Sequence, residues 1–159
     1  MRLLIVTPVR DEAAHLDVVI DAMAAQTRRP DLWVVVEDGS VDGSRELLER
    51  RARELDFMRV VVAPSAPHAT ARDRLAAGAA PRTFNLGLHA AGPGGWDFIG
   101  KLDGDIQLPS NCFERLLAEF ARDPELGIVE DDAFAGSVGG SAADLAFLRK
   151  PIDVVATGY

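Results

Sequence analysis

The chain has 159 residues, of which 17 are basic and 25 acidic, so its formal charge at pH 7 is −8. This length fits a single domain, and 48 % hydrophobic residues can bury a real core, which excludes a chain that is disordered throughout. No run of about 18 uncharged apolar residues occurs, so the sequence predicts no membrane-spanning helix.

The predicted elements alternate between strands and helices along the chain. Strands are predicted at Leu3–Val6, Leu32–Val36, Met58–Ala63, Trp96–Leu102 and Leu126–Glu130. The first two lack polar alternation, as strands buried on both faces of a parallel sheet do, whereas Met58–Ala63 and Trp96–Leu102 alternate partly. Apolar residues at helical spacing predict helices around Leu16–Met23, Gly43–Leu55, Thr83–Ala91 and Phe113–Phe120. This order predicts an α/β fold, with a mainly parallel sheet covered by helices on both faces.

Three stretches do not fit this alternation. Ala63–Pro81 contains three prolines and is long for a connection, so we expect a mobile or functional loop. Ala135–Ala143 is rich in small residues and reads as a flexible segment. We expect Asp144–Tyr159 to form one helix and the start of a strand.

The net charge limits which partners the protein can bind, and the cysteine content indicates the compartment in which it works. A pI near 4.8 argues against a nucleic-acid-binding surface, although an acidic protein can handle polyanions through a divalent cation. Cys112 is the single cysteine, which excludes an internal disulfide and a multi-cysteine zinc site. We therefore predict a cytoplasmic protein, associated with membranes only through parts outside this chain. Arg10 and Asp11 follow the first apolar run at once, so this run reads as a strand rather than a signal peptide.

Carboxylates follow three of the predicted strands, where the carboxyl ends of parallel strands meet and ligands usually bind. The acidic residues at this edge are Glu12, Glu37, Asp38, Asp42, Asp103 and Asp105. No basic partner is obvious, and such a cluster is unfavourable by mutual repulsion. A bound cation would remove that cost.

The triplet Asp103-Gly104-Asp105 has two readings. Two carboxylates separated by one glycine suit Mg²⁺ or Mn²⁺, which take oxygen ligands and leave positions for substrate phosphates. An Asp-Gly pair between apolar residues is also a hairpin signal. A phosphatase with an aspartate nucleophile would carry its Asp-x-Asp after the first strand, whereas this one follows the fourth.

The segment from Asp38 to Glu49 resembles a calcium-binding loop in its spacing. A strand rather than a helix precedes it, and Arg45 stands where an aliphatic residue normally packs. The simpler reading is a turn in which Ser40 or Asp42 caps the following helix. Asp38 is not explained by that turn, and a carboxylate there can accept from a base imide or a ribose hydroxyl.

The remaining polar candidates are individually weak. Thr7-Pro8 lacks the G-x-G-x-x-G pattern of dinucleotide-binding folds, which argues against a dehydrogenase. Arg10 is either a ligand or a solvated surface charge, and Arg82 would suit pairing with a diphosphate. Gly87 would allow tight packing of a helix on the sheet. The three histidines share no spacing, so we interpret each as structural or solvated.

Taken together, four motifs resemble the family 2 glycosyltransferases with the GT-A fold. They are LLIVTPVRDEAAHL, WVVVEDGSVDGS, RTFNLGL and FIGKLDGDIQLPSNCFERL, in an order and spacing that cover roughly residues 2–130. The resemblance implies a Rossmann-like three-layer sandwich and a transferase that uses a nucleotide-diphosphate sugar, most often UDP-linked. Asp38 would contact the base, and Glu37 replaces the first aspartate of the family's usual Asp-Asp-Gly-Ser.

The resemblance also implies a set of site residues. Nucleotide-binding residues would be Thr7, Pro8, Arg10, Glu12, Asp38, Arg82, Asn85, Lys101 and Asp103, and the ligands of Mg²⁺ or Mn²⁺ would be Asp103 and Asp105. The family's catalytic base comes well after its Asp-x-Asp site. Glu130, Asp131 and Asp132 are weak candidates, because they come early for that base.

The chain accordingly looks like the donor-binding half of such an enzyme, either shortened or a divergent short protein. Residues 1–130 would form the nucleotide-sugar-binding domain, and residues 131–159 would begin the acceptor side. The first hypothesis is a metal-dependent, inverting glycosyltransferase acting on an unknown acceptor. The alternatives are a non-catalytic nucleotide-sugar-binding module and a nucleotidyltransferase-like enzyme.

Overall fold

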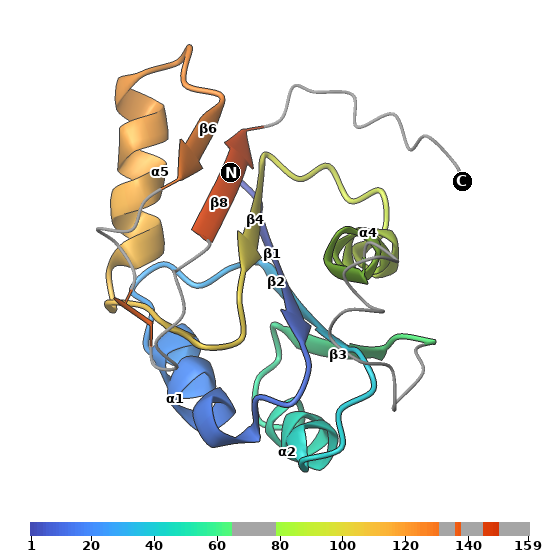
Figure 1. Ribbon diagram of the computed structural model, residues 1–159. Helices are drawn as coiled ribbons and strands as arrows, with labels where there is room; N and C mark the ends of the chain where they lie inside the picture. The colour runs from blue at the N-terminus through green and yellow to red at the C-terminus, as the bar shows by residue number, and fades with distance from the viewer. Residues whose placement is uncertain (65–78, 131–135, 138–144, 150–159) are drawn as a thin grey trace.

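A computed structural model of the protein describes residues 1–64, 79–130, 136–137 and 145–149 (Figure 1). The helices are α1 (Ala13–Ala24), α2 (Ser44–Arg51), α4 (Ala79–Ala91) and α5 (Cys112–Arg122). The strands are β1 (Leu3–Val9), β2 (Leu32–Glu37), β3 (Met58–Val62), β4 (Phe98–Leu102), β5 (Ile106–Gln107), β6 (Ile128–Glu130), β7 (Gly136–Ser137) and β8 (Leu145–Arg149). None of the helices in these ranges is long and apolar enough to cross a membrane.

Six strands form the main sheet, in the order β3-β2-β1-β4-β8-β6, and β5 pairs separately with β7. The first four run parallel, while β8 is antiparallel to both of its neighbours. The prediction of an α/β fold with a mainly parallel sheet is therefore confirmed. Central strands β1 and β2 are almost wholly buried, as their unbroken apolar runs predicted.

The C-terminal part differs from the expectation. Leu145–Arg149 forms strand β8, inserted between β4 and β6, at the beginning of the segment for which we expected one helix and the start of a strand. The four apolar residues of this segment are too few for their periodicity to separate helix from strand, so pairing with β4 decides. Most of the two predicted loops, Ala63–Pro81 and Ala135–Ala143, lies outside the described residues.

Two helices also begin or end at other residues than the sequence predicted. The second helix ends at Arg51 rather than Leu55. The third, α4, begins at Ala79, four residues early, with Pro81 in its first turn. Proline is tolerated there because the first amides of a helix have no intrahelical partner.

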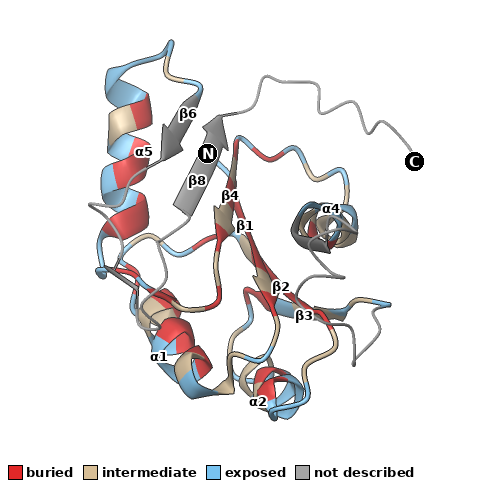
Figure 2. Ribbon diagram, viewed as in Figure 1, coloured by how far each residue is buried: buried red, intermediate tan, exposed pale blue. Residues whose placement is uncertain are grey.

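Helices cover both faces of the sheet and bury a separate apolar core on each (Figures 1 and 2). Helices α1, α2 and α5 share one core with Trp33, and α4 packs over a smaller core that contains Trp96. Strand β1 serves both, because its side chains alternate between the faces: Ile5 points into the first core and Val6 into the second.

Helix α4 approaches the sheet very closely at Gly87. A Cβ atom at this position would lie 2.4 Å from Val6 Cγ1 and 3.0 Å from Val36 Cγ2. The predicted role of Gly87 in tight helix–sheet packing is thus confirmed. This contact fixes α4 over β1 and β2, with its first turns near the carboxyl edge of the sheet.

Candidate functional site

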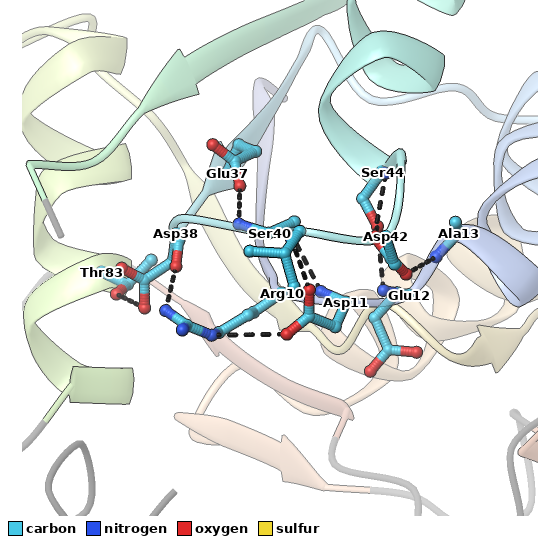
Figure 3. Close-up of polar contacts among 11 residues, drawn as sticks. Arg10, Asp11, Glu12, Ala13, Glu37, Asp38, Ser40, Asp42, Ser44 and Thr83 are labelled. Carbon is cyan, nitrogen blue, oxygen red and sulfur yellow. Dashed lines mark hydrogen bonds and ion pairs between the residues drawn. The ribbon is translucent and has the colours of Figure 1, made fainter. Parts of the chain in front are cut away.

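The loops that follow β1 and β2 lie side by side at the carboxyl edge of the sheet and are joined by many polar contacts (Figure 3). The backbone amide of Asp38 donates to the carbonyl of Val9 at 2.9 Å, which extends the strand pairing by one residue. Side chains from each loop then bond to the backbone of the other. This interlocking gives the edge a defined shape before any ligand is considered.

Asp38 is an almost fully enclosed carboxylate at this edge, with only 5 % of the residue exposed. The Thr83 hydroxyl on α4 donates to Asp38 Oδ2 at 3.4 Å, and Arg10 donates to the Asp38 carbonyl oxygen at 2.6 Å (Figure 3). A carboxylate this buried requires such partners, because an uncompensated one is strongly unfavourable. Asp38 is therefore positioned by its own strand β2, by the loop after β1 and by α4.

Arg10 is not a solvated surface charge. Its side chain is 14 % exposed, and besides the Asp38 carbonyl it contacts the Asp11 carboxylate at 3.5 Å. Asp11 adopts a positive φ of 55° and accepts from the amide of Val41 at 2.7 Å. Arg10 and Asp11 together tie the loop after β1 to the loop after β2.

Glu37, the departure from the family's usual sequence, is 1 % exposed. Its carboxylate turns back to accept a hydrogen bond from the backbone amide of Ser40. The hydroxyl of Ser40 in turn accepts from the amide of Asp11 at 3.1 Å. Glu37 therefore shapes the turn.

Asp42 joins the N-termini of two helices. It accepts from the amide of Ala13 in α1 at 2.9 Å and from the amide of Ser44 in α2 at 3.0 Å. Burial acts to raise the pKa of the Asp42 carboxyl, but hydrogen bonds from Ser44 and Ala13 outweigh it, so the pKa lies below its ordinary value. Asp42 thus satisfies an amide at the start of α2, as the turn interpretation predicted, although the N-cap residue itself is Gly43.

The calcium-loop reading finds no support in this geometry. The carboxylate oxygens of Asp42 accept from helix amides, and Glu49 pairs with Arg45 at 3.0 Å. No group of three His, Cys, Asp or Glu side chains placed to hold a metal occurs among the described residues.

The Asp103-Gly104-Asp105 triplet is not a hairpin turn. Strand β4 pairs with β1 and β8, while β5 pairs with β7, so the strands on either side of the triplet do not pair with each other. Gly104 also lies outside the left-handed region that such a turn uses. It is buried against the loop after β1, where an added Cβ would lie 3.2 Å from Val9 Cγ2 and 3.4 Å from Glu12 Cγ.

This close approach brings the triplet beside Glu12. Burial raises the pKa of the Glu12 carboxyl, and the charge of Asp105 raises it further, with smaller effects from Asp42 and Asp103 and an opposing one from His15. The expectation of a cluster without basic partners is wrong in one respect: Lys101 Nζ lies 2.7 Å from Asp103 Oδ1.

Asp103 and Asp105 are the two carboxylates of this triplet that could hold a divalent cation. Mg²⁺ is commonly bound by one or two carboxylates plus substrate phosphates and waters, so a cage of three protein ligands is not required.

The other candidates are more scattered. Thr7 is fully buried, and its hydroxyl accepts from the Trp33 indole nitrogen at 2.9 Å, while Pro8 is half-buried. Arg82 and Asn85 are exposed on α4. Glu130 ends β6, and Asp131 and Asp132 lie outside the described residues.

Sequence reasoning missed Thr83, which contacts Asp38 across 45 residues of chain. Its signal was available, because Thr83 and Gly87 are four residues apart and so share the face of α4 that packs on the sheet. A threonine on an otherwise apolar helix face is a candidate partner for a buried carboxylate.

Comparison with solved structures identifies the fold. Residues of this chain align with S. aureus TarS 1–349 in complex with UDP (TM-score 0.58, 17 % identity, 77 % of this chain and 32 % of that one). They also align with the mannosyltransferase PcManGT from Pyrobaculum calidifontis in complex with GDP-Man and Mn²⁺ (0.66, 18 %, 93 % and 44 %). A third is glucosyl-3-phosphoglycerate synthase from Mycobacterium tuberculosis, with Mn²⁺, UDP and glucosyl-3-phosphoglycerate (0.51, 22 %, 81 % and 43 %).

These structures confirm the predicted GT-A, Rossmann-like fold. The chain spans about a third of the length of TarS 1–349 and less than half of the other two. No curated protein sequence matches it significantly. The sequence profile of Glycosyl transferase family 2 matches residues 4–131, which is most of the chain. The protein therefore belongs to glycosyltransferase family 2.

Proposed function

We propose that this chain is the donor-binding part of a metal-dependent glycosyltransferase, which transfers a sugar from a UDP-sugar to an acceptor with inversion. The observation that carries the proposal is the convergence of Asp38 and the Asp103–Asp105 triplet on the loop after β1. In this proposal, the carboxylate that would contact the base and the pair that would bind the metal lie on either side of one short loop, which suits a nucleoside diphosphate.

In this proposal Asp38 accepts a hydrogen bond from the imide N–H of the base. Its enclosed position strengthens such a bond, because water competes poorly there. Arg82 and Asn85, exposed on the same helix as Thr83, bind near the diphosphate or ribose. Thr7 and Pro8 contribute as the end of β1, the side chain of Thr7 being turned into the core.

Asp103 and Asp105 are the proposed ligands of Mg²⁺ or Mn²⁺, supported by the Mn²⁺ in the mannosyltransferase and synthase complexes. A divalent cation there would act as a Lewis acid that stabilises the departing diphosphate. The chain's own contribution is the close packing of Gly104 against the loop after β1, which brings the triplet beside Glu12.

Inversion requires a base that takes the proton of the attacking acceptor hydroxyl. Glu130, Asp131 and Asp132 stay weak candidates for that role. We assign residues 1–130 to donor binding and residues 131–159 to the start of the acceptor side. We place the reaction in the cytoplasm, a reducing compartment suited to a chain with one cysteine.

Calorimetry with UDP and Mn²⁺ tests the donor site. We expect saturable binding that weakens at least about tenfold in Asp103→Asn plus Asp105→Asn, because charge-assisted contacts of this kind are worth roughly 1.5–3 kcal/mol. Asp56→Asn plus Glu125→Gln, both at exposed positions, changes the net charge equally and should bind as the wild type does. Equal binding by all three proteins would remove the metal assignment.

Turnover separates the proposed transferase from its two alternatives. Release of free sugar or transfer from a UDP-sugar would exclude a purely binding module. Stronger binding of free nucleoside triphosphates than of UDP-sugars would instead indicate a nucleotidyltransferase.

A further inference from the structure

Lys101 lies beside the triplet and makes a direct ion pair with it. Its ammonium nitrogen is 2.7 Å from Asp103 Oδ1, and its side chain is 28 % exposed. The chain has 17 basic residues, and Lys101 is one of only two lysines among them. The residue type and its position beside a proposed metal ligand both need an explanation.

The strand explains how the pair forms. Residues two apart on a strand point to the same face, so Lys101 in β4 and Asp103 just after it are neighbours without a turn. Lys101 stands opposite Val6 in the register of β1 and β4, and Ile99 precedes it in the apolar core under α4. The lysine stem therefore lies over apolar surface, while its charge reaches the carboxyl edge.

The pair lies in a strongly acidic environment. The charges of Asp105 and, less strongly, Asp103 both act on the half-buried carboxyl of Glu12. Lys101 places one positive charge directly on Asp103, which offsets part of the repulsion among the three carboxylates. The Lys101 ammonium thus partly neutralises the carboxylate that a bound metal ion would neutralise.

A lysine suits this task better than an arginine. Its ammonium is a compact point charge that contacts one carboxylate oxygen, whereas a guanidinium tends to hold both oxygens of a carboxylate in a fixed fork. The four-carbon stem can also rotate without moving the strand. The ammonium can therefore leave Asp103 for another anion without any movement of the backbone.

We propose that Lys101 is the resident counterion of Asp103, that it yields this carboxylate to a divalent cation, and that its released ammonium then binds a phosphate oxygen of the nucleotide. The inference rests on the proposed function, because it takes Asp103 and Asp105 as the metal site. It adds an exchange role for Lys101: its ammonium pairs with Asp103 when the site is empty and with a phosphate oxygen when the metal and the nucleotide are bound.

The proposal predicts opposite effects on two ligands. Lys101→Met keeps the stem and removes the charge, so Mn²⁺ alone, measured by the electron paramagnetic resonance signal of the free ion, should bind about three- to tenfold tighter. UDP at saturating Mn²⁺ should bind at least about tenfold more weakly, because a charge-assisted phosphate contact is lost. Uridine, which has no phosphate, should bind equally well to both proteins.

Arg122→Met is the matched control, because it removes one positive charge from an exposed pair with Glu119 on α5. It should leave all three affinities unchanged. Lys101→Arg keeps the charge and should bind Mn²⁺ more weakly than the wild type. Lys101→Gln serves as the charge-free variant if the methionine protein fails to fold by circular dichroism.

The outcomes separate the inference from the proposed function. If the wild type binds Mn²⁺ and UDP but Lys101→Met behaves as Arg122→Met does, the exchange role is overturned and the donor site stands. A lysine that only stabilises the fold would weaken binding of Mn²⁺, UDP and uridine together. If the wild type binds neither Mn²⁺ nor UDP, both proposals fail.

Discussion

At the scale of single residues, the carboxyl edge is built from buried polar groups that each have a specific partner. Arg10 bonds to the backbone of Asp38, Thr83 bonds to its carboxylate, and Glu37 holds the amide of Ser40. Each of these contacts fixes a group that would otherwise be costly to bury. The site is therefore rigid where the proposed base contact lies.

The contact between Thr83 and Asp38 leads to a prediction for nucleotide binding. Thr83→Val keeps the shape of the side chain and removes the hydroxyl, so the Asp38 carboxylate loses one positioning hydrogen bond. We expect UDP and uridine to bind about two- to tenfold more weakly, in line with roughly 0.5–1.5 kcal/mol for one hydrogen bond. Thr83→Ser keeps the hydroxyl and should restore most of the affinity in calorimetry. A valine variant that binds uridine as well as the wild type would contradict a positioning role.

At the scale of secondary-structure elements, two features place the loops. Asp42 holds the first turns of α1 and α2 together, and Gly87 lets α4 rest on β1 and β2. The helices thereby fix the ends of the loops that carry the candidate residues. Each feature leads to a prediction on stability.

The Asp42 carboxyl predicts a dependence of stability on pH. Its pKa is lower in the folded chain than in the unfolded one, so its stabilising effect is complete above about pH 4 and is lost as the pH falls through the folded value. Asp42→Asn should cost about 0.3–1 kcal/mol at pH 6, because an anion at a helix N-terminus is worth that much. Urea unfolding at pH 6 and pH 3 should show this difference shrinking at the lower pH. Asp56→Asn, at an exposed position, should show no such trend.

The close approach at Gly87 predicts a destabilised α4. Gly87→Ala would place a methyl group 2.4 Å from Val6 Cγ1, so the helix must move away from the sheet. Overpacking of this kind typically costs about 1–3 kcal/mol. Gly127→Ala is the control, since nothing lies within 4 Å of its added carbon, and it should change the free energy of unfolding by less than about 0.5 kcal/mol. Equal stability of the two variants in urea would show that α4 does not pack as described.

At the scale of the whole molecule, one sheet separates two cores that share strands β1 and β2. The chain has two tryptophans, and each reports on a different core: Trp33 on the α1 side and Trp96 under α4. Because β1 contributes to both cores, neither can be lost while the other stays intact. The molecule should unfold as one unit.

Single-tryptophan variants test this. In Trp96→Phe the fluorescence follows the first core, and in Trp33→Phe it follows the second. In each variant we expect the fluorescence transition in urea to coincide with the loss of helical circular dichroism, as two-state unfolding requires. The two variants will differ in midpoint, because Trp33 is fully buried and donates to Thr7, but each should be internally consistent. Separate transitions within one variant would indicate that the cores unfold independently.

The sequence by itself determined the order of the elements and the edge at which the polar residues gather. Unbroken apolar runs such as Leu3–Val6, in alternation with helical patterns, are typical of strands in the middle of a parallel sheet, and residues after such strands lie at its carboxyl edge. The family also followed from local motifs, because their order and spacing survive without any contact being known. These features depend on neighbours in the chain.

Tertiary structure alone decided what depends on residues far apart. The pairing of β8 with β4, the contact of Thr83 with Asp38, and the role of Arg10 in holding that loop each join segments separated by dozens of residues. The reading of Asp103–Asp105 as a hairpin failed for the same reason, since β4 and β5 found other partners. Periodicity and spacing record which face a residue occupies, whereas its partner across that face is set by the packing of the whole chain.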